Sequence, residues 1–140
     1  MQKAIKTVIV DDNTFLIKAI QEKLSFFDDI QIKFTALDGS DLLTKISNNH
    51  NIDVILMDID MPLMNGLEAT RRALTLIPDL KIMAFTMFGD KEYNDKIREL
   101  GAKGFVSKTV DIEELELAIE TILNGHNYFQ NTELVNSISI

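Results

Sequence analysis

Short runs rich in β-branched and aromatic residues alternate with segments of helical periodicity along this 140-residue chain, and this alternation restricts the fold more than any other feature. The runs lie at residues 5–10, 30–36, 53–58, 81–86 and 104–107. The segments between and after them carry apolar residues at intervals of three and four, and the clearest stripe is Ile112, Leu115, Ile119 and Ile122. Five strand–helix units in succession predict a parallel sheet covered by helices on both faces.

The second run differs from the other four in its pattern. The segments VIV, VILM and IMAF are continuously apolar, as expected for strands that are buried on both faces. In the second run, Ile30, Ile32 and Phe34 alternate with polar residues, which is typical of an edge strand with one face in water. An edge position agrees with the strand order 2-1-3-4-5, so we predict a flavodoxin-like (βα)5 doubly wound fold of the α/β class.

Composition limits the classes of function. The net charge is −8 and no Lys/Arg cluster is longer than Arg71-Arg72, so the chain by itself is a poor binder of nucleic acid. It has no cysteine, which excludes disulfides and thiolate metal sites. No apolar run approaches the roughly 20 residues of a membrane span, and the N-terminus lacks the features of a signal peptide. We therefore expect a cytoplasmic protein without membrane contact.

The periodic pattern ends shortly after the fifth predicted helix. Asp111 can cap this helix, with Glu114 three residues later and Gly125 after its end. We therefore expect one domain over residues 1–125. Residues 126–140 have no strong period and are rich in Asn and Ser, so we expect a tail or the start of a linker, with a short helix considered around residues 132–136.

Acidic residues stand at the ends of two predicted strands. Asp11 and Asp12 follow the first run, and Asp58 ends the third. Function gathers at the carboxyl ends of the strands in this fold, and the predicted order makes these two strands neighbours. Three ionised carboxylates in one crevice repel one another unless a cation neutralises them. Oxygen ligands without His or Cys favour Mg²⁺, with Mn²⁺ as a substitute.

A hydroxyl group and an ammonium group belong to the same edge. Thr86 ends the fourth run, and Lys108 follows the fifth. With the carboxylates and a metal ion, this set resembles a phosphoryl-transfer site, where positioning and charge neutralisation dominate catalysis. A carboxylate can serve as the nucleophile and form an aspartyl phosphate.

Four motifs in sequence order carry a family resemblance: VIVDDN, ILMDIDMPLMNG, AFT and GAKGFVSK. Over about residues 5–125 the chain resembles the receiver domains of two-component response regulators. GAKGFVSK and the later GHNYF look most like the NarL/LuxR transcription-factor branch. The resemblance implies a phosphorylation-dependent switch, not an enzyme beyond its own phosphorylation and dephosphorylation. It also implies a histidine kinase as partner, and DNA contact only through an output domain that we do not expect within these 140 residues.

The resemblance also implies a role for each site residue. Asp58 would accept the phosphoryl group, assisted by Lys108. The Mg²⁺ ligands would be Asp11 (partly through water), Asp12, Asp58 and the backbone carbonyl of Asp60. Thr86 and Lys108 would bind phosphoryl oxygens. Thr86 and Phe105 would form the switch, in which the aromatic ring swings inward as the threonine moves.

One position departs from the family pattern, and two further residues bear on the phosphorylated lifetime. Thr109 follows Lys108 where many receivers carry a proline after a cis bond, which leaves the local backbone open. Met87 and Phe88 are bulky, and we hypothesise that they hinder the attacking water and lengthen the phosphorylated lifetime.

A homodimer would form through helices 1 and 5, or through the face of strand 5 and helices 4 and 5.

Three alternatives stay open. The Asp-Ile-Asp motif at residues 58–60 also suits a haloacid-dehalogenase-like phosphatase, but the later strands lack the further acidic ligands, and Asp11 and Asp12 would be unexplained. A stand-alone interaction module on the same fold would not need the complete acid set. A flavin carrier would need a phosphate-cradling loop after the first strand, and none is found there.

Overall fold

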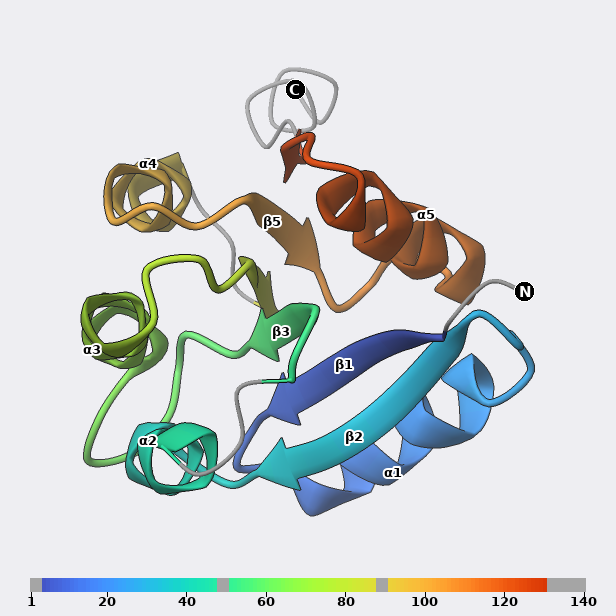
Figure 1. Cartoon of the computed structure of the whole chain (residues 1–140), viewed down its shortest axis with the longest axis horizontal. Coiled ribbons are helices and arrows are strands. Elements are labelled where there is room, and N and C mark those ends of the chain that lie inside the picture. Colours follow the sequence, from blue (N-terminus) through green and yellow to red (C-terminus); the bar gives the residue numbers. More distant parts are fainter. Residues whose placement is uncertain (1–3, 48–50, 88–90, 131–140) are drawn as a thin grey trace, which may run out of the picture.

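A computed structural model describes residues 4–47, 51–87 and 91–130 as one parallel sheet flanked by helices (Figure 1). The strands are β1 (Ile5–Val10), β2 (Ile30–Ala36), β3 (Val54–Met57), β4 (Ile82–Thr86), β5 (Gly104–Ser107) and β6 (Tyr128–Phe129). The helices are α1 (Thr14–Leu24), α2 (Gly39–Ser47), α3 (Gly66–Leu76), α4 (Lys91–Glu99) and α5 (Ile112–Leu123). No described helix has the length and apolar character of a membrane span.

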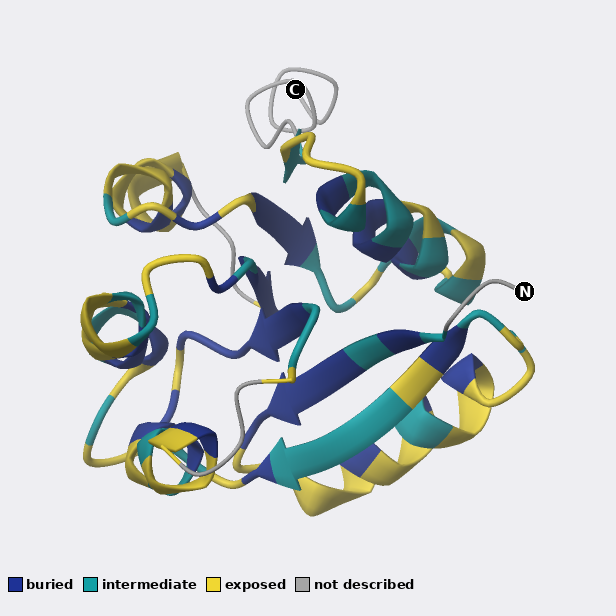
Figure 2. Cartoon of the chain, in the orientation of Figure 1, coloured by how far each residue is buried: buried dark blue, intermediate teal, exposed yellow. Residues whose placement is uncertain are grey.

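The helices form one layer on each face of the sheet. Helices α2, α3 and α4 cover one face, and α1 and α5 cover the other (Figure 1). Successive residues of β1 point to opposite layers, so that Ile9 packs with α1 and α5 while Val8 and Val10 pack with α2 and α3. The central strands are therefore buried on both sides (Figure 2), which explains their continuously apolar sequences.

The strand order is β2-β1-β3-β4-β5-β6, which confirms the predicted order of the first five strands. β2 lies at one edge of the sheet, as its alternating sequence predicted. Gln31 is exposed there, whereas Ile30 and Ala36 at the ends of the strand are buried.

The sheet continues beyond the end of α5, which the sequence did not predict. β6 pairs in parallel with β5, and the backbone N–H of Tyr128 donates to the carbonyl of Lys103 at 2.9 Å. A strand of two residues is too short to show a period of two, so its pairing with β5 is not visible in the sequence. The helix considered around residues 132–136 lies outside the described residues.

Candidate functional site

The three predicted acidic residues meet at the carboxyl ends of β1 and β3. These strands are paired, and the N–H of Asp58 donates to the carbonyl of Val10 at 3.0 Å. Carboxylate oxygens of Asp11, Asp12 and Asp58 lie within 4.8 Å of one another. Asp11 and Asp58 are buried and Asp12 is exposed, so the cluster is open to solvent on one side. Three convergent oxygen donors with one open side fit a hard divalent cation such as Mg²⁺.

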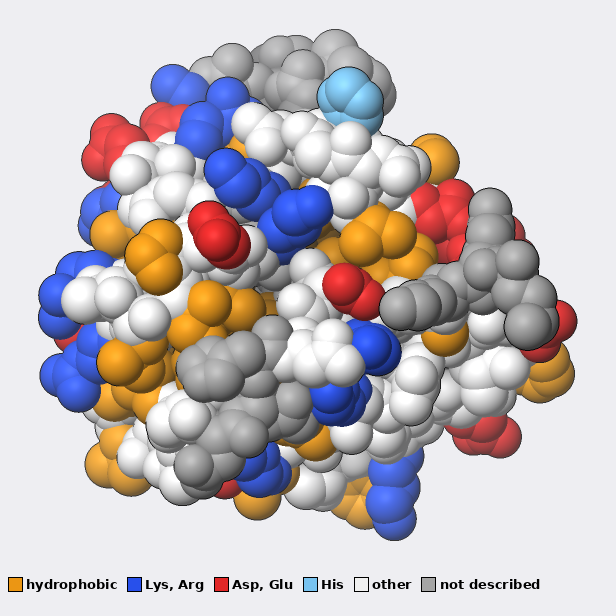
Figure 3. Space-filling view, in the orientation of Figure 1, with side chains coloured by type: hydrophobic (Ala, Val, Ile, Leu, Met, Phe, Trp, Pro, Cys, Tyr) orange, Lys and Arg blue, Asp and Glu red, His pale blue; other side chains and the backbone are white. Residues whose placement is uncertain are grey.

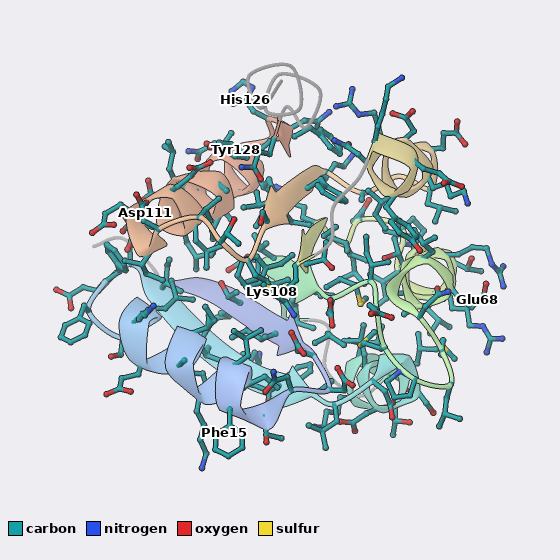
Figure 4. The ribbon with its side chains drawn as sticks, turned by 180° about the vertical axis from the view of Figure 1, so that it is seen from behind. Phe15, Glu68, Lys108, Asp111, His126 and Tyr128 are labelled. Carbon is teal, nitrogen blue, oxygen red and sulfur yellow. The ribbon has the colours of Figure 1, made fainter. Side chains whose placement is uncertain are left out.

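Lys108 reaches this cluster from the end of β5. Its Nζ forms an ion pair with Oδ2 of Asp11 and lies 3.5 Å from Oδ1 of Asp58. The lysine side chain is only 6% exposed, and its backbone N–H is held by the carbonyl of Thr86 at 2.9 Å. The described residues contain no cis peptide bond, so the bond between Lys108 and Thr109 is trans. Figure 4 shows Lys108 near the middle of the molecule, beside the ends of the central strands.

The electrostatics of Asp58 follow from this arrangement. Burial raises the pKa of the Asp58 carboxyl, and repulsion from Asp11 raises it further. The ammonium group of Lys108 and the hydroxyl of Thr86 act in the opposite direction, but they do not cancel the rise in pKa. One ammonium group thus leaves the three carboxylates under-neutralised, which is a physical reason for a further cation at this position.

A pocket of about 310 Å³ lies between the end of β4, the loop after β3 and α4. Its lining residues are Ile59, Asp60, Asn65, Thr86 and Tyr93. Thr86 is buried at the end of β4, whereas the side chain of Asp60 is exposed. The sequence indicated Asp60 and Thr86, but it did not indicate Asn65 or Tyr93. Tyr93 belongs to the apolar stripe of the fourth helix, so its sequence context favours a core position over a pocket wall.

The loop between β3 and α3 brings the helix close to the backbone of Asp58. The N–H of Gly66 donates to the carbonyl of Ile59 at 2.8 Å, and Asn65 caps α3 by accepting from the N–H of Glu68 at 3.0 Å. A Cβ atom on Gly66 would lie 2.1 Å from the carbonyl oxygen of Asp58. Glycine is therefore required here by close approach of two backbones. The Asn-Gly pair opens a helix and does not form a hairpin.

Phe105 lies on β5, three residues before Lys108. Phe105 pairs across the sheet with Ala84, and Ala84 stands two residues before Thr86. The ring of Phe105 is completely buried in a cluster with Ile59 and Ile97. Phe129 packs against the same cluster from β6. Of the two bulky residues after β4, Met87 is 52% exposed, and Phe88 lies outside the described residues.

Comparisons with known proteins agree with this geometry. A family model described as "Response regulator receiver domain" matches residues 7–120. The oxygen regulatory protein NreC of Staphylococcus carnosus (strain TM300) is 36% identical over 136 residues, which cover 94% of this chain and 62% of that protein. The chain therefore spans less than two thirds of the length of this relative.

Two solved structures illustrate the structural similarity. A two-component response regulator of the LuxR family from Aurantimonas sp. SI85-9A1 is 26% identical with a TM-score of 0.87, covering 98% of this chain and 96% of that chain. CheY of Borrelia burgdorferi, in a complex with CheX, BeF3 and Mg²⁺, is 24% identical with a TM-score of 0.79. That match covers 87% of this chain and 90% of that chain, and at this identity it shows the fold alone.

Proposed function

Because the chain belongs to the family of response regulator receiver domains, we propose that Asp58 is its phosphoacceptor in two-component signalling. Asp11, Asp12, Asp58 and the backbone carbonyl of Asp60 would hold Mg²⁺, or Mn²⁺ in its place, beside the acceptor. One observation carries this proposal: three carboxylates from two strands converge within 4.8 Å beside the buried ammonium group of Lys108.

The phosphoryl donor is the phosphohistidine of a histidine kinase. A carboxylate oxygen of Asp58 attacks the phosphorus atom and forms a P–O bond while the P–N bond of the donor breaks. The electron pair leaves with the histidine nitrogen, which then takes up a proton. Lys108 and Thr86 donate hydrogen bonds to the phosphoryl oxygens. Mg²⁺, when bound, supplies charge neutralisation for the oxygens of the group in transfer.

The attacking carboxylate must be ionised, and its environment bears on that requirement. Burial and Asp11 hold the pKa of Asp58 above its ordinary value. A cation among the three carboxylates offsets both causes, so metal binding and nucleophile formation are coupled. This coupling explains why the site combines carboxylates that would repel one another in the absence of a metal ion.

Thr86 and Phe105 are the proposed switch residues. An aspartyl phosphate brings about 1.5 to 2 negative charges and strong acceptor oxygens, which attract the Thr86 hydroxyl at the end of β4. Phe105 on the neighbouring strand responds because it pairs with Ala84 and packs under α4. The receiver is in equilibrium between two conformations. This equilibrium shifts by the difference between the interaction free energies of the phosphoryl group in the two conformations.

DNA contact would belong to an output domain beyond the receiver, and residues 126–140 would be a tail or the start of a linker to it. Two relatives support this view. NreC of Staphylococcus carnosus is longer than this chain, and the response regulator from Aurantimonas is described as a member of the LuxR family. Figure 3 shows Lys and Arg side chains in a row from the upper left edge to the centre of this face, with acidic side chains beside them. The net charge of −8 nevertheless makes the chain by itself a poor partner for a phosphate backbone.

Two faces are candidates for homodimer formation. Helices α1 and α5 carry the exposed side chains of Phe15 and Leu117, which are 86% and 53% exposed. The second candidate face, formed by α4, β5 and α5, is partly covered by β6. We therefore favour the face of α1 and α5.

The test is phosphorylation by acetyl phosphate in the presence of Mg²⁺, measured by mass spectrometry of the intact protein. The wild type should gain the mass of one phosphoryl group, and Asp58→Asn should gain none. Asp60→Asn is a matched control, because only the backbone carbonyl of Asp60 has a proposed role and its substitution should leave labelling intact. An unlabelled wild type, or a labelled Asp58→Asn variant, would refute the proposal. Sustained hydrolysis of phosphate esters would favour a phosphatase.

A further inference from the structure

The last described residues of the chain occupy the outer edge of β5. The N–H groups of Tyr128 and Gln130 donate to the carbonyls of Lys103 and Phe105, each at 2.9 Å. The side-chain Oε1 of Gln130 accepts from the N–H of Ser107 at 2.8 Å. Residues 128–130 thus form hydrogen bonds with the backbone along the whole length of β5. Figure 1 shows β6 beside β5, next to α5.

Side chains from two helices hold the same segment. Nδ2 of Asn94 on α4 donates to the carbonyl of Gln130 at 3.3 Å. The guanidinium group of Arg98, also on α4, lies 3.9 Å from the ring centroid of Phe129, which is a cation–π contact. The hydroxyl of Tyr128 donates to Oε2 of Glu114 on α5 at 3.0 Å. The segment is therefore docked through specific contacts with α4, β5 and α5.

These contacts lie close to the proposed phosphoacceptor site. Ser107, whose N–H is bound by Gln130, directly precedes Lys108. Phe129 packs on the cluster that contains Phe105. Since Phe105 is already completely buried, a movement of β5 or α4 must change the surface on which Phe129 rests. The docked segment therefore contacts two places that a change at Asp58 can reach: Ser107, which is next to Lys108, and the cluster that contains Phe105.

One buried group of this arrangement is not satisfied. Asn94 is 8% exposed, and its Oδ1 has no hydrogen-bond partner in the part of the chain that the structure describes. An unpaired buried acceptor is unfavourable. Within the described residues, Asn94 therefore holds the docked segment through its Nδ2 group alone.

We propose that residues 128–130 are a phosphorylation-sensitive latch: they dock on β5 and α4 while Asp58 is unmodified, and phosphorylation releases them. In the unmodified site, Lys108 pairs with Asp11 and Asp58. A phosphoryl group attracts Lys108 and Thr86 to new acceptors. The N–H of Ser107 then moves relative to Gln130, and α4 carries Asn94 and Arg98 with it. Release frees residues 128–130 from β5 and α4, and this inference rests on the proposed role of Asp58.

Amide hydrogen exchange of Tyr128 and Gln130 in the 140-residue chain tests the proposal. The same sample, with and without acetyl phosphate and Mg²⁺, is analysed by mass spectrometry for the phosphoryl group. Both amides should be protected in the unmodified protein and should exchange at least about tenfold faster after phosphorylation. The amide of Ile55, which donates to Lys81 at 2.8 Å in the centre of the sheet, is the internal control and should stay protected.

A pair of glutamine variants separates the latch from the chemistry. Gln130→Ala removes the acceptor for Ser107, so Tyr128 should exchange faster without phosphorylation, while Asp58 should still take up the phosphoryl group. Gln31→Ala alters an exposed glutamine on the opposite edge of the sheet and should change neither readout. A phosphorylated protein in which both amides exchange at the original or a lower rate would overturn the latch and leave the phosphoacceptor standing. No phosphoryl mass in the wild type would overturn both.

Discussion

Replacing Lys108 by methionine removes the ammonium group from the acidic cluster and leaves a side chain of similar length. In the wild type, Nζ of this lysine pairs with Asp11 and lies 3.5 Å from Asp58. In the variant, the three carboxylates of the cluster have lost this partner. We expect a lower free energy of unfolding in the absence of divalent cations.

The burial of the groups sets the magnitude. The side chains of Lys108, Asp11 and Asp58 are 6%, 3% and 6% exposed, so these are buried ion pairs. Removing one partner of a buried pair costs about 3–5 kcal/mol. We expect the lower end of this range, because Asp12 opens the cluster to water. A loss of about 3 kcal/mol corresponds to a melting temperature roughly 6–12 °C lower for a chain of this size.

The metal dependence gives the same variant a second, independent readout. Lys108 and Mg²⁺ neutralise the same carboxylates, so the variant should bind Mg²⁺ more tightly than the wild type. A ligand at one hundred times its Kd stabilises a protein by about 2.7 kcal/mol, which is enough to recover most of the loss. Mg²⁺ should therefore raise the melting temperature of Lys108→Met more than that of the wild type.

Calorimetry in EDTA and in MgCl2 measures both effects. Lys103→Met is the control, because Lys103 is an exposed lysine near the start of β5 and its substitution should change stability by less than about 0.5 kcal/mol. A loss below about 1 kcal/mol in EDTA would show that the buried-pair reasoning is wrong. An equal gain from Mg²⁺ in variant and wild type would contradict the competition between lysine and metal.

Three other substitutions test other parts of the structure. Gly66→Ala would place Cβ 2.1 Å from the carbonyl oxygen of Asp58, so we expect a loss of about 3 kcal/mol or more in urea denaturation. Gly39→Ala would meet side chains and no backbone, Sδ of Met64 at 2.7 Å and Cβ of Ala69 at 2.9 Å, and should cost less. Asp111→Ala removes the cap of α5 and should cost about 1 kcal/mol in the same assay. A hydrogen bond with Asp29 raises the pKa of Glu120 from 4.5 to about 6, so its folded form holds the proton more tightly than the unfolded form. Stability then falls as pH rises from about 4.5 to 6, and Glu120→Gln should melt higher than the wild type above this window but not below it.

Much of the fold could be predicted because burial leaves a direct trace in the sequence. The alternation of Ile30, Ile32 and Phe34 predicted the edge position of β2, and the structure confirms it. Asp111 stands at the N-cap of α5, as its spacing from Glu114 indicated. The convergence of Asp11 and Asp58 followed from the strand order, since the carboxyl ends of neighbouring parallel strands lie at one edge.

Other features depend on tertiary contacts that leave no local pattern. β6 is held by Arg98 and Glu114 on two different helices, and neither residue signals a strand partner in the sequence. The ion pair between Lys108 and Asp11 depends on the direction of a long side chain across the sheet. The hypothesis that Met87 and Phe88 lengthen the phosphorylated lifetime stays a prediction, because Phe88 lies outside the described residues.

The burial of Phe105 bears on its proposed role as a switch residue. The resemblance to receivers implies an aromatic ring that moves inward when Thr86 moves, but this ring is already completely enclosed. The inward movement of the ring stays a prediction. Phe129 covers the same cluster from outside the five strand–helix units, and it is half-buried. We therefore expect a displacement around Phe105 to be transmitted to Phe129.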